Sequence, residues 1–321
     1  MKAAIVREFG RPPEYGDFEE PTPRPGETVV SVSAAAVSTL VRSRVAGVHY
    51  SADRALPQVP GIDGVGRTPD GRRVYFLFPR RPFGSIAERT TVANDRLIPL
   101  PDELDDVTAA AAGNPGMSCW IPLTLLAPIP SGESVLINGA TGIAGRMAIQ
   151  VAKHLGARKV IATGRDESKL RTLVALGADV VLPLSQPPET LRDAVRKEVH
   201  DAEVGVVLDY LWGPYAEAIL GAIGGPDGPR GASRIRYVQV GSLAGPTITL
   251  DAAKLRSSGV EILGSGIGST SEKAIAAGLS RFLSALASAR FRIETEVRPL
   301  SDVERAWSDS SGERRLVFTV P

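Results

Sequence analysis

The chain has little of several residue types, and each shortage excludes a class of protein. One cysteine, Cys119, among 321 residues rules out a disulfide within the chain and any cysteine-rich structural zinc site. No apolar run reaches the length of about 18 residues that a membrane-spanning helix needs. The first residues lack a basic stretch followed by an apolar one, so no export signal is expected. A cytoplasmic protein is the expectation.

An excess of charge of one sign is also lacking. Lys plus Arg number 37 and Asp plus Glu 36, so no net field would attract nucleic acid or an anionic membrane. Aromatic residues make up only 5%, with 43% hydrophobic and 23% charged residues, which is typical of an ordinary globular protein. Since domains usually hold about 100 to 200 residues, two domains are expected, with neither nucleic acid nor a membrane as partner.

Local patterns predict two kinds of structure. Short β-branched runs, such as Thr28–Val32 and Arg73–Phe76, occur before about residue 110 between Pro- and Gly-rich turns, which predicts an irregular β-rich lobe. From Ser134 onward, apolar strands alternate with segments of helical period. Strands are predicted at 135–138, 160–163, 180–182, 204–209, 235–241 and 260–264. Six such strands predict a doubly wound α/β nucleotide-binding domain with a parallel sheet.

The end of the sequence predicts a return to the first lobe. A loop is expected at 226–231, a long amphipathic helix at 271–290 and a final strand at 314–320. We therefore expect a discontinuous β-rich domain, residues 1–115 with 266–321, and a nucleotide-binding domain at 116–265.

A glycine-rich turn joins the first strand of the parallel sheet to a helix predicted at 146–155. The turn reads Gly139-Ala140-Thr141-Gly142-Ile143-Ala144-Gly145. Its glycines permit close approach to a pyrophosphate, and the first N–H groups of a helix favour an anion. The spacing Gly-x-x-Gly-x-x-Gly alone is a weak signal, and a turn without a ligand is the alternative. The alternation of strands and helices around it favours a dinucleotide.

The residues after the second strand indicate which dinucleotide is expected. A carboxylate at this place would bind the ribose 2′-hydroxyl of NAD. The chain reads Gly164-Arg165-Asp166-Glu167-Ser168-Lys169. If Gly164 ends the strand, Arg165 and Lys169 can bind a 2′-phosphate, which predicts NADPH. If the strand ends one or two residues later, Asp166 would lie against the ribose, which would favour NAD. In the further alternative, Asp166 and Glu167 only cap the helix that follows, and Arg165 and Lys169 bind no phosphate.

These features occur in one order with several other motifs. The motifs that accompany the glycine-rich turn are Pro57–Gly66, Asp70–Val74, Asn114–Ser118, Leu176–Asp179 and Arg315–Val317. In their order and spacing the whole chain resembles the medium-chain dehydrogenase/reductase superfamily, and within it the zinc-free quinone oxidoreductase-like branch. The resemblance implies a Rossmann domain with a GroES-like β-rich lobe, and a homodimer, since relatives often pair through the edge of the nucleotide-binding sheet.

The resemblance also implies chemistry without a metal. Zinc enzymes of the superfamily hold zinc at three positions that are occupied here by Ser38, Ile62 and Asn114. These residue types do not supply the thiolate, imidazole or carboxylate ligands that zinc needs.

The scarce reactive residues have mostly ordinary interpretations. The three histidines show no paired metal-ligand spacing, and surface roles are expected for His154 and His200. His49 lies with Tyr50 in a loop that borders the substrate cleft in relatives. Cys119 has no basic partner in sequence and is interpreted as a small buried hydrophobe.

Candidate site residues follow from the resemblance. Hydrogen bonds to substrate are implied for Ser38, Tyr50 and Asn114, which are the candidates for catalysis. Cofactor contacts are implied for Asn114, Ser118, Gly139, Ala140, Thr141, Gly142, Ile143, Ala144, Gly164, Arg165, Lys169, Gly241, Ser242, Leu243, Gly264, Ser265, Gly266 and Arg315. Each has an ordinary alternative. Gly241 and Gly264 would then only end strands, Asn114 would only cap the helix that follows, and Arg315 would lie exposed on the final strand.

The implied function is the NADPH-dependent transfer of a hydride to a quinone or an α,β-unsaturated carbonyl compound. Quinone reduction needs no acid from the protein, because water can protonate the product, whereas enone reduction would benefit from a donor such as Tyr50 or Ser38. Two alternatives remain open. The first is an enoyl-thioester reductase, which would require a basic rim for its acyl carrier, and the sequence shows no concentrated basic patch. The second is a sensor that binds NADPH without catalysis.

Overall fold

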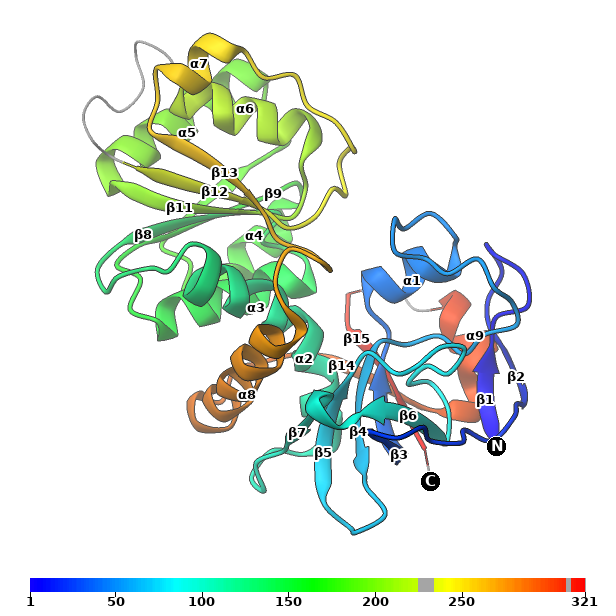
Figure 1. Ribbon diagram of the computed structural model, residues 1–321. Coiled ribbons are helices and arrows are strands. Elements are labelled where there is room, and N and C mark those ends of the chain that lie inside the picture. The colour runs from blue at the N-terminus through cyan, green and yellow to red at the C-terminus, as the bar shows by residue number, and fades with distance from the viewer. Residues whose placement is uncertain (225–233, 310–312, 321) are drawn as a thin grey trace. The chain divides into compact units, whose positions relative to one another are not determined.

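The computed structural model of the protein describes residues 1–224, 234–309 and 313–320. The chain folds into two compact units. One unit combines residues from both ends of the sequence, Met1–Met117 and Ser271–Pro321, and the other is Ser118–Thr270. Figure 1 shows both units with their elements labelled.

A parallel sheet forms the centre of the unit Ser118–Thr270. Its strands within the described ranges are β8 (Ser134–Asn138), β9 (Val160–Gly164), β10 (Val180–Pro183), β11 (Val204–Asp209), β12 (Ile235–Gln239) and β13 (Val260–Gly264). They lie in the order β10-β9-β8-β11-β12-β13. The chain moves outward from β8 in one direction and then returns to β11 to move outward in the other. This order confirms the predicted doubly wound fold and places the topological switch between β8 and β11.

Helices cover both faces of this sheet, as Figure 1 shows. One face carries α3 (Ile143–His154) and α4 (Glu167–Thr172), and the other carries α5 (Pro188–Ala202) and α6 (Gly213–Ile223); α7 (Ala252–Arg256) follows β12. Every residue of β8, β9 and β11 is buried as a result. This double coverage is why these strands are nearly continuous apolar runs in the sequence.

The other unit is rich in β-strands. Its strands are β1 (Lys2–Ile5), β2 (Glu14–Asp17), β3 (Glu27–Ala36), β4 (Asp63–Arg67), β5 (Arg73–Leu77), β6 (Arg89–Ala93), β7 (Leu97–Pro99), β14 (Thr295–Pro299) and β15 (Arg315–Thr319). The main sheet has the order β14-β15-β3-β4-β5-β7 in the part of the chain that is described, and β6 also pairs with β3. β15 pairs antiparallel with β3, with Val317 opposite Ala36, which confirms the predicted return of the final strand to the first lobe.

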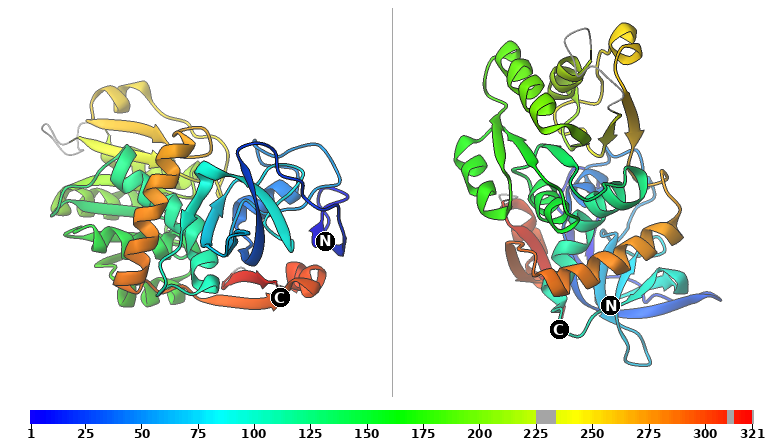
Figure 2. Two further views of the ribbon diagram at one scale, coloured as in Figure 1. Left: turned by 60° about the horizontal axis from the view of Figure 1, so that its bottom comes forward. Right: turned by 90° about the vertical axis from the view of Figure 1, so that its left-hand side faces the viewer.

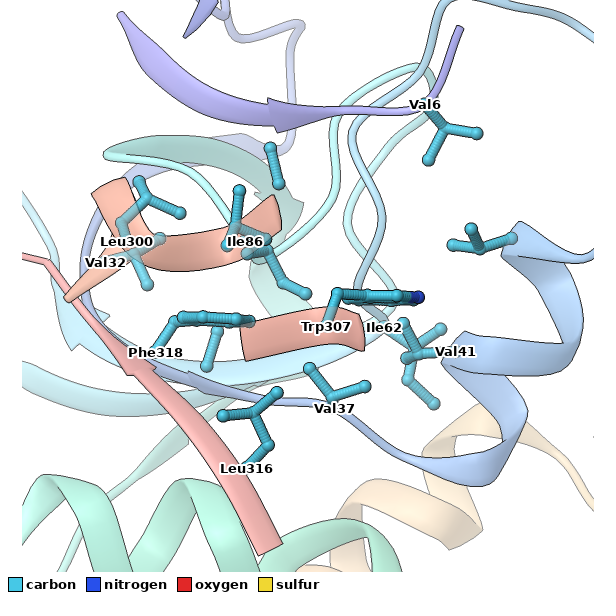
Figure 3. Close-up of a cluster of buried hydrophobic side chains, with 14 of the residues drawn as sticks. Val6, Val32, Val37, Val41, Ile62, Ile86, Leu300, Trp307, Leu316 and Phe318 are labelled. Atoms are coloured by element: carbon cyan, nitrogen blue, oxygen red, sulfur yellow. The ribbon is translucent and has the colours of Figure 1, made fainter. Parts of the chain in front are cut away.

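A hydrophobic cluster fills the β-rich unit. The helices α1 (Thr39–Val45) and α9 (Val303–Asp309) contribute side chains to this cluster. Two longer helices also begin in this unit, α2 (Asp106–Ile121) and α8 (Glu272–Ala289). The first segment of the unit ends at Met117, so α2 continues past its boundary. Figure 2 shows α8 as one long helix, in orange. Figure 3 shows Trp307 of α9 beside Ile62, and Phe318 of β15 in the same cluster. Burial of each such side chain contributes about 1.5 to 3 kcal/mol, so these positions are held mainly by packing.

Two predicted boundaries were wrong. The helix expected from residue 146 begins at Ile143, because Gly142 is its extended N-cap and the chain turns helical directly after it. The strand expected to reach residue 241 ends at Gln239, because Val240 N and Gly241 N both turn to donate to Asp209 O. The loop predicted at 226–231 lies outside the described residues. None of the described helices is both long and apolar enough to cross a membrane.

Candidate functional site

The glycine-rich turn lies at the carboxyl end of β8, beside the topological switch. Gly139 has φ +88°, a left-handed conformation that favours glycine, and a Cβ there would lie 2.8 Å from Leu211 Cγ. Gly145, in the first turn of α3, packs against the turn itself. A Cβ at Gly145 would lie 2.5 Å from Ala140 Cα and 2.6 Å from Gly139 O. Glycine is therefore required at Gly139 for the turn to lie against Leu211, and at Gly145 for α3 to lie against the turn.

The start of α3 is suited to an anion. The N-cap Gly142 has no side chain that could accept from the first N–H groups of this 12-residue helix. These groups carry the positive end of the helix dipole. Gly139 N donates to Thr163 Oγ1 at 3.2 Å and Ala140 N donates to Thr163 O at 2.8 Å, so those two groups hold the turn against β9. An anion would be bound by N–H groups further along, at the start of the helix.

The second strand ends at Gly164, as the interpretation with NADPH requires. A Cβ at Gly164 would lie 2.5 Å from Thr141 Cγ2, so the end of β9 lies directly against the glycine-rich turn. Arg165 follows and is exposed. Asp166 caps α4, since its Oδ1 accepts from Ser168 N at 2.9 Å and Lys169 N at 3.1 Å. The hydrogen bonds to Ser168 and Lys169 lower the pKa of Asp166.

Lys169 is less available than Arg165. Its Nζ lies 3.8 Å from Asp166 Oδ2, so the helix cap partly offsets its charge. The capping carboxylate of Asp166 and the ammonium of Lys169 therefore lie close together at the start of α4. Arg165 is therefore the exposed cation directly after the end of β9.

Four buried side chains form what we call the polar row, one on each of four neighbouring strands. They are Thr163 on β9, Asn138 on β8, Asp209 on β11 and Tyr237 on β12, each 0% exposed. Thr163 Oγ1 donates to Asn138 Oδ1, Asn138 Nδ2 donates to Asp209 Oδ1 and Tyr237 OH donates to Asp209 Oδ2, each at 2.7 Å. Burial raises the pKa of Asp209, and these hydrogen bonds oppose the shift.

Sequence reasoning missed the polar row. The signal available was a polar residue near the end of three apolar strands, in Ile137-Asn138, Ala162-Thr163 and Leu208-Asp209. Tyr237, inside its strand, gave no signal at all. Such residues need partners when they are buried, so a polar residue at a buried strand end predicts a partner on a neighbouring strand.

The loops after β11 and β12 lie at the same edge of the sheet. Ser118 Oγ lies 3.5 Å from Tyr210 OH, and a Cβ at Gly241 would lie 2.7 Å from Tyr210 O. Ser242 and Leu243 are exposed beyond that contact. The structure therefore brings the predicted residues at 118, 139–142 and 241–243 around the switch point.

The last of the predicted loops follows β13, the outer strand. Ser265 N donates to Gln239 O at 2.8 Å, and Gly266 N donates to Ser269 Oγ at 3.0 Å. Gly264 ends the strand, with open space where a Cβ would be. This loop starts from the same edge, two strands away from β11.

The candidates in the β-rich unit fall into two groups. Asn114 and Arg315 come together, because Arg315 Nη2 donates to Asn114 Oδ1 at 3.3 Å. Ser38 is 1% exposed and caps α1, with its Oγ accepting from Val41 N at 3.1 Å. Tyr50 is 74% exposed, and its ring centroid lies 4.3 Å from that of His49. Burial lowers the pKa of His49, and the charge of Arg44 adds to the shift.

Arg315 belongs to a buried cluster with Asp63 and Tyr75. It is 5% exposed, so the ordinary interpretation as an exposed arginine was wrong. Tyr75 OH donates to Asp63 Oδ2, and both residues are buried. Burial raises the pKa of Asp63 to about 6, and both the hydrogen bond from Tyr75 and the charge of Arg315 oppose the shift.

The raised pKa of Asp63 predicts a pH-dependent contribution to stability. Well below pH 4 the carboxyl is protonated in both the folded and the unfolded chain. As pH rises, the unfolded chain loses this proton first, so the free energy of unfolding falls until pH passes about 6. The total loss is roughly 3 kcal/mol, from a pKa difference of about two units.

Urea unfolding of the wild type and Asp63→Asn, measured from pH 4 to pH 7.5, checks this expectation. The stability of the wild type relative to the variant should decline as pH rises. A constant difference, or one that increases with pH, would show that Arg315 keeps the carboxyl ionised at low pH.

The three positions that relatives with zinc use for ligands have other roles here. Ile62 is 2% exposed within the hydrophobic cluster of Figure 3, beside Trp307. Ser38 caps a helix, and Asn114 accepts from Arg315. Across residues 1–224, 234–309 and 313–320, no group of three or more His, Cys, Asp or Glu side chains could hold a metal ion. This donor set does not fit zinc.

The other reactive side chains lie as follows. Cys119 is buried, and burial raises the pKa of its thiol, so it packs as a small hydrophobe. His154 ends α3 and His200 lies on α5, both exposed, which confirms the surface positions expected for them.

Comparisons with known proteins agree with this geometry. A family model described as zinc-binding dehydrogenase matches residues 144–284. The probable NADPH-dependent quinone reductase tdiC of Emericella nidulans is 30% identical, over an alignment that covers 100% of both proteins. A mycobacterial quinone oxidoreductase structure has a TM-score of 0.85 at 23% identity and covers 99% of each chain. The quinone oxidoreductase of Thermus thermophilus, also solved with NADPH, has a TM-score of 0.81 at 26% identity and covers 99% of this chain and 100% of its own.

The fold, the turn at its switch point and the full-length similarity define a medium-chain dehydrogenase/reductase. Within that superfamily the chain belongs to the quinone oxidoreductase-like family, as its sequence predicted. The members compared above are named as oxidoreductases.

Proposed function

We propose that this protein is an NADPH-dependent oxidoreductase that transfers a hydride to a quinone or to an α,β-unsaturated carbonyl compound without zinc. The observation that carries the proposal is the edge of the sheet at the switch point. There the glycine-rich turn lies against the start of α3, and β9 ends at Gly164 immediately before Arg165. The names of the full-length relative and of the Thermus structure, both of which include NADPH, support the choice of cofactor.

The residues at this edge fit a phosphorylated dinucleotide. The turn and the first residues of α3, Gly139–Ala144, would hold the diphosphate, because glycine allows the backbone to approach it and the helix dipole favours an anion. Arg165, aided by Lys169, would bind the 2′-phosphate beside Gly164. The remaining contacts are assigned to Ser118, Gly241, Ser242, Leu243, Gly264, Ser265, Gly266, Asn114 and Arg315. When bound, the nicotinamide supplies the hydride.

The side chains of the β-rich unit would orient the acceptor. Arg315 donates to Asn114 Oδ1, so this bond does not occupy the Asn114 amide N–H₂. That group can donate to a carbonyl oxygen. Ser38 Oγ accepts from Val41 N, but its O–H remains a donor. Tyr50, exposed in its loop, is the other candidate donor for an enone, while a reduced quinone takes its proton from water.

We also propose two domains and a homodimer. The β-rich domain comprises 1–115 with 266–321, and the nucleotide-binding domain comprises 116–265. β13 is one of the two outer strands of the described parallel sheet, and Ile262 on it is 39% exposed, so this edge offers backbone groups and apolar surface for pairing with a second copy. Light scattering of the purified protein tests the dimer through its molar mass.

The test of function is turnover with both nucleotides. Purified protein should oxidise NADPH faster than NADH when a simple naphthoquinone or an enal is present. Stopped-flow absorbance at the nicotinamide band measures both rates, and omission of the acceptor is the control. NADPH binding without turnover on any quinone, enal or enone would overturn the proposal and favour a sensor. Turnover confined to enoyl thioesters would favour the reductase of acyl carriers.

A further inference from the structure

Asp209 connects the loops of the proposed dinucleotide site. Its Oδ1 accepts from Asn138 Nδ2 at 2.7 Å, from Leu211 N at 2.8 Å and from Trp212 N at 3.0 Å, while Oδ2 accepts from Tyr237 OH at 2.7 Å. Its backbone O accepts from Val240 N and Gly241 N. One fully buried residue therefore contacts the ends of β8, β11 and β12.

Asp209 Oδ1 sets the direction of the bonds that lead from Asn138 to the glycine-rich turn. It accepts from the backbone N–H groups of Leu211 and Trp212, and Asn138 turns its amide N–H₂ toward it as a third donor. The Asn138 Oδ1 then faces Thr163 and accepts from its hydroxyl. Because the Thr163 hydroxyl donates to Asn138, its oxygen is the acceptor for Gly139 N. Hydrogen bonds thus connect Asp209 through two side chains to the backbone of the glycine-rich turn.

The same carboxylate stabilises a strained residue. Trp212 has φ +57° and ψ −154°, a conformation that residues other than glycine rarely adopt and that costs about 1 to 3 kcal/mol. The bond from Trp212 N to Asp209 Oδ1 fixes this conformation. Leu211, the preceding residue, is the one that packs against Gly139, at the position where a Cβ would lie. The Asp209 side chain therefore fixes the turn after β11, and Leu211 of that turn contacts the glycine-rich turn.

We propose that Asp209 is the positioning residue of the whole dinucleotide site. It fixes the glycine-rich turn and the turn after β11 together, and so determines affinity for the diphosphate and ribose portion that NADPH and NADH share. It does not act on the 2′-phosphate, which Arg165 meets outside the polar row. The proposal rests on the proposed function for the identity of the ligand, but its structural part concerns the protein alone.

Three variants separate the parts of the row. Asp209→Ala removes both acceptors, and we expect the dissociation constants for NADPH and NADH to rise together by about tenfold or more, with their ratio unchanged. Asp209→Asn should have a smaller effect, because its amide oxygen can keep the bonds at Oδ1 and its N–H₂ can donate to the Tyr237 hydroxyl. Tyr237→Phe removes only the bond at Oδ2 and should have a similarly small effect.

Val207→Ala is the matched control. Val207 is 0% exposed on the same strand and lies opposite Tyr237, but it forms none of the hydrogen bonds of the polar row, so its truncation lowers the melting temperature through packing and leaves those bonds in place. At a temperature well below the melting transitions, Val207→Ala should bind both nucleotides like the wild type. Fluorescence titration measures all the constants. Equal binding by Asp209→Ala and Val207→Ala, or a changed ratio of NADPH to NADH, would overturn the proposal.

Hydrogen exchange without ligand keeps the proposal testable if the wild type binds neither nucleotide, an outcome that would refute the proposed function. Mass spectrometry of the segments 136–145 and 210–215 should show faster exchange in Asp209→Ala than in Val207→Ala. Protection of these segments equal to that in the control would refute the positioning role.

Discussion

Gly145→Val is expected to weaken dinucleotide binding severely. A Cβ at this position would lie 2.5 Å from Ala140 Cα, 2.6 Å from Gly139 O and 2.9 Å from Ala140 C, all of them backbone atoms that cannot move aside as a side chain can. A branched side chain would therefore push α3 away from the turn. We expect the dissociation constant for NADPH to rise by about 100-fold or more, and the melting temperature to fall, because overpacking costs typically about 1 to 3 kcal/mol.

Gly142→Ala provides the control for Gly145→Val. Gly142 has φ −75°, and the atom nearest to a Cβ there is Gly139 O at 3.8 Å, an ordinary contact. This variant should fold with nearly the melting temperature of the wild type. Thermal unfolding of both variants compares their stability, and isothermal titration with NADPH measures the loss of binding in Gly145→Val. Tight NADPH binding by Gly145→Val would show that the diphosphate is held elsewhere.

Arg165→Glu is expected to reverse the preference between the two nucleotides. The arginine follows the end of β9 at Gly164, where a carboxylate in place of a guanidinium would repel a 2′-phosphate and accept from a ribose 2′-hydroxyl. Loss of charge-assisted bonds costs about 1.5 to 3 kcal/mol before repulsion is counted. The dissociation constant for NADPH should therefore rise by about 100-fold, while that for NADH stays the same or falls.

Arg171→Glu is the matched control, since Arg171 is exposed on α4, the helix that follows Arg165, and the substitution changes the net charge equally. It should leave the ratio of the two constants near that of the wild type. If Arg165→Glu weakens both nucleotides alike, Arg165 does not meet the phosphate, and the preference for NADPH must have another source.

The sequence was sufficient for the parts of this fold that depend on local pattern. Strands such as β11 are buried on both faces, so each is an apolar run that can be recognised without its neighbours. The glycine-rich turn was recognisable because its glycines are spaced between such a strand and a helix. The end of β9, on which the choice of nucleotide depends, was predicted only to within one or two residues, and the structure places it at Gly164.

Features that depend on distant partners were not predictable in this way. The polar row joins Asn138 to Asp209, 71 residues apart in sequence, and no local pattern indicates that pairing. Arg315 similarly bonds to Asn114 across 201 residues, which is why its burial was not foreseen. The early start of α3 was missed because an extended glycine can be either the interior of a turn or the cap of a helix.

A crystal structure with NADPH at saturating concentration tests the central claim most directly. We expect the diphosphate against the N–H groups at the start of α3, and the 2′-phosphate within hydrogen-bond distance of the Arg165 guanidinium. Electron density for the nucleotide at any other place, with nothing bound beside residues 139–145, would contradict the account.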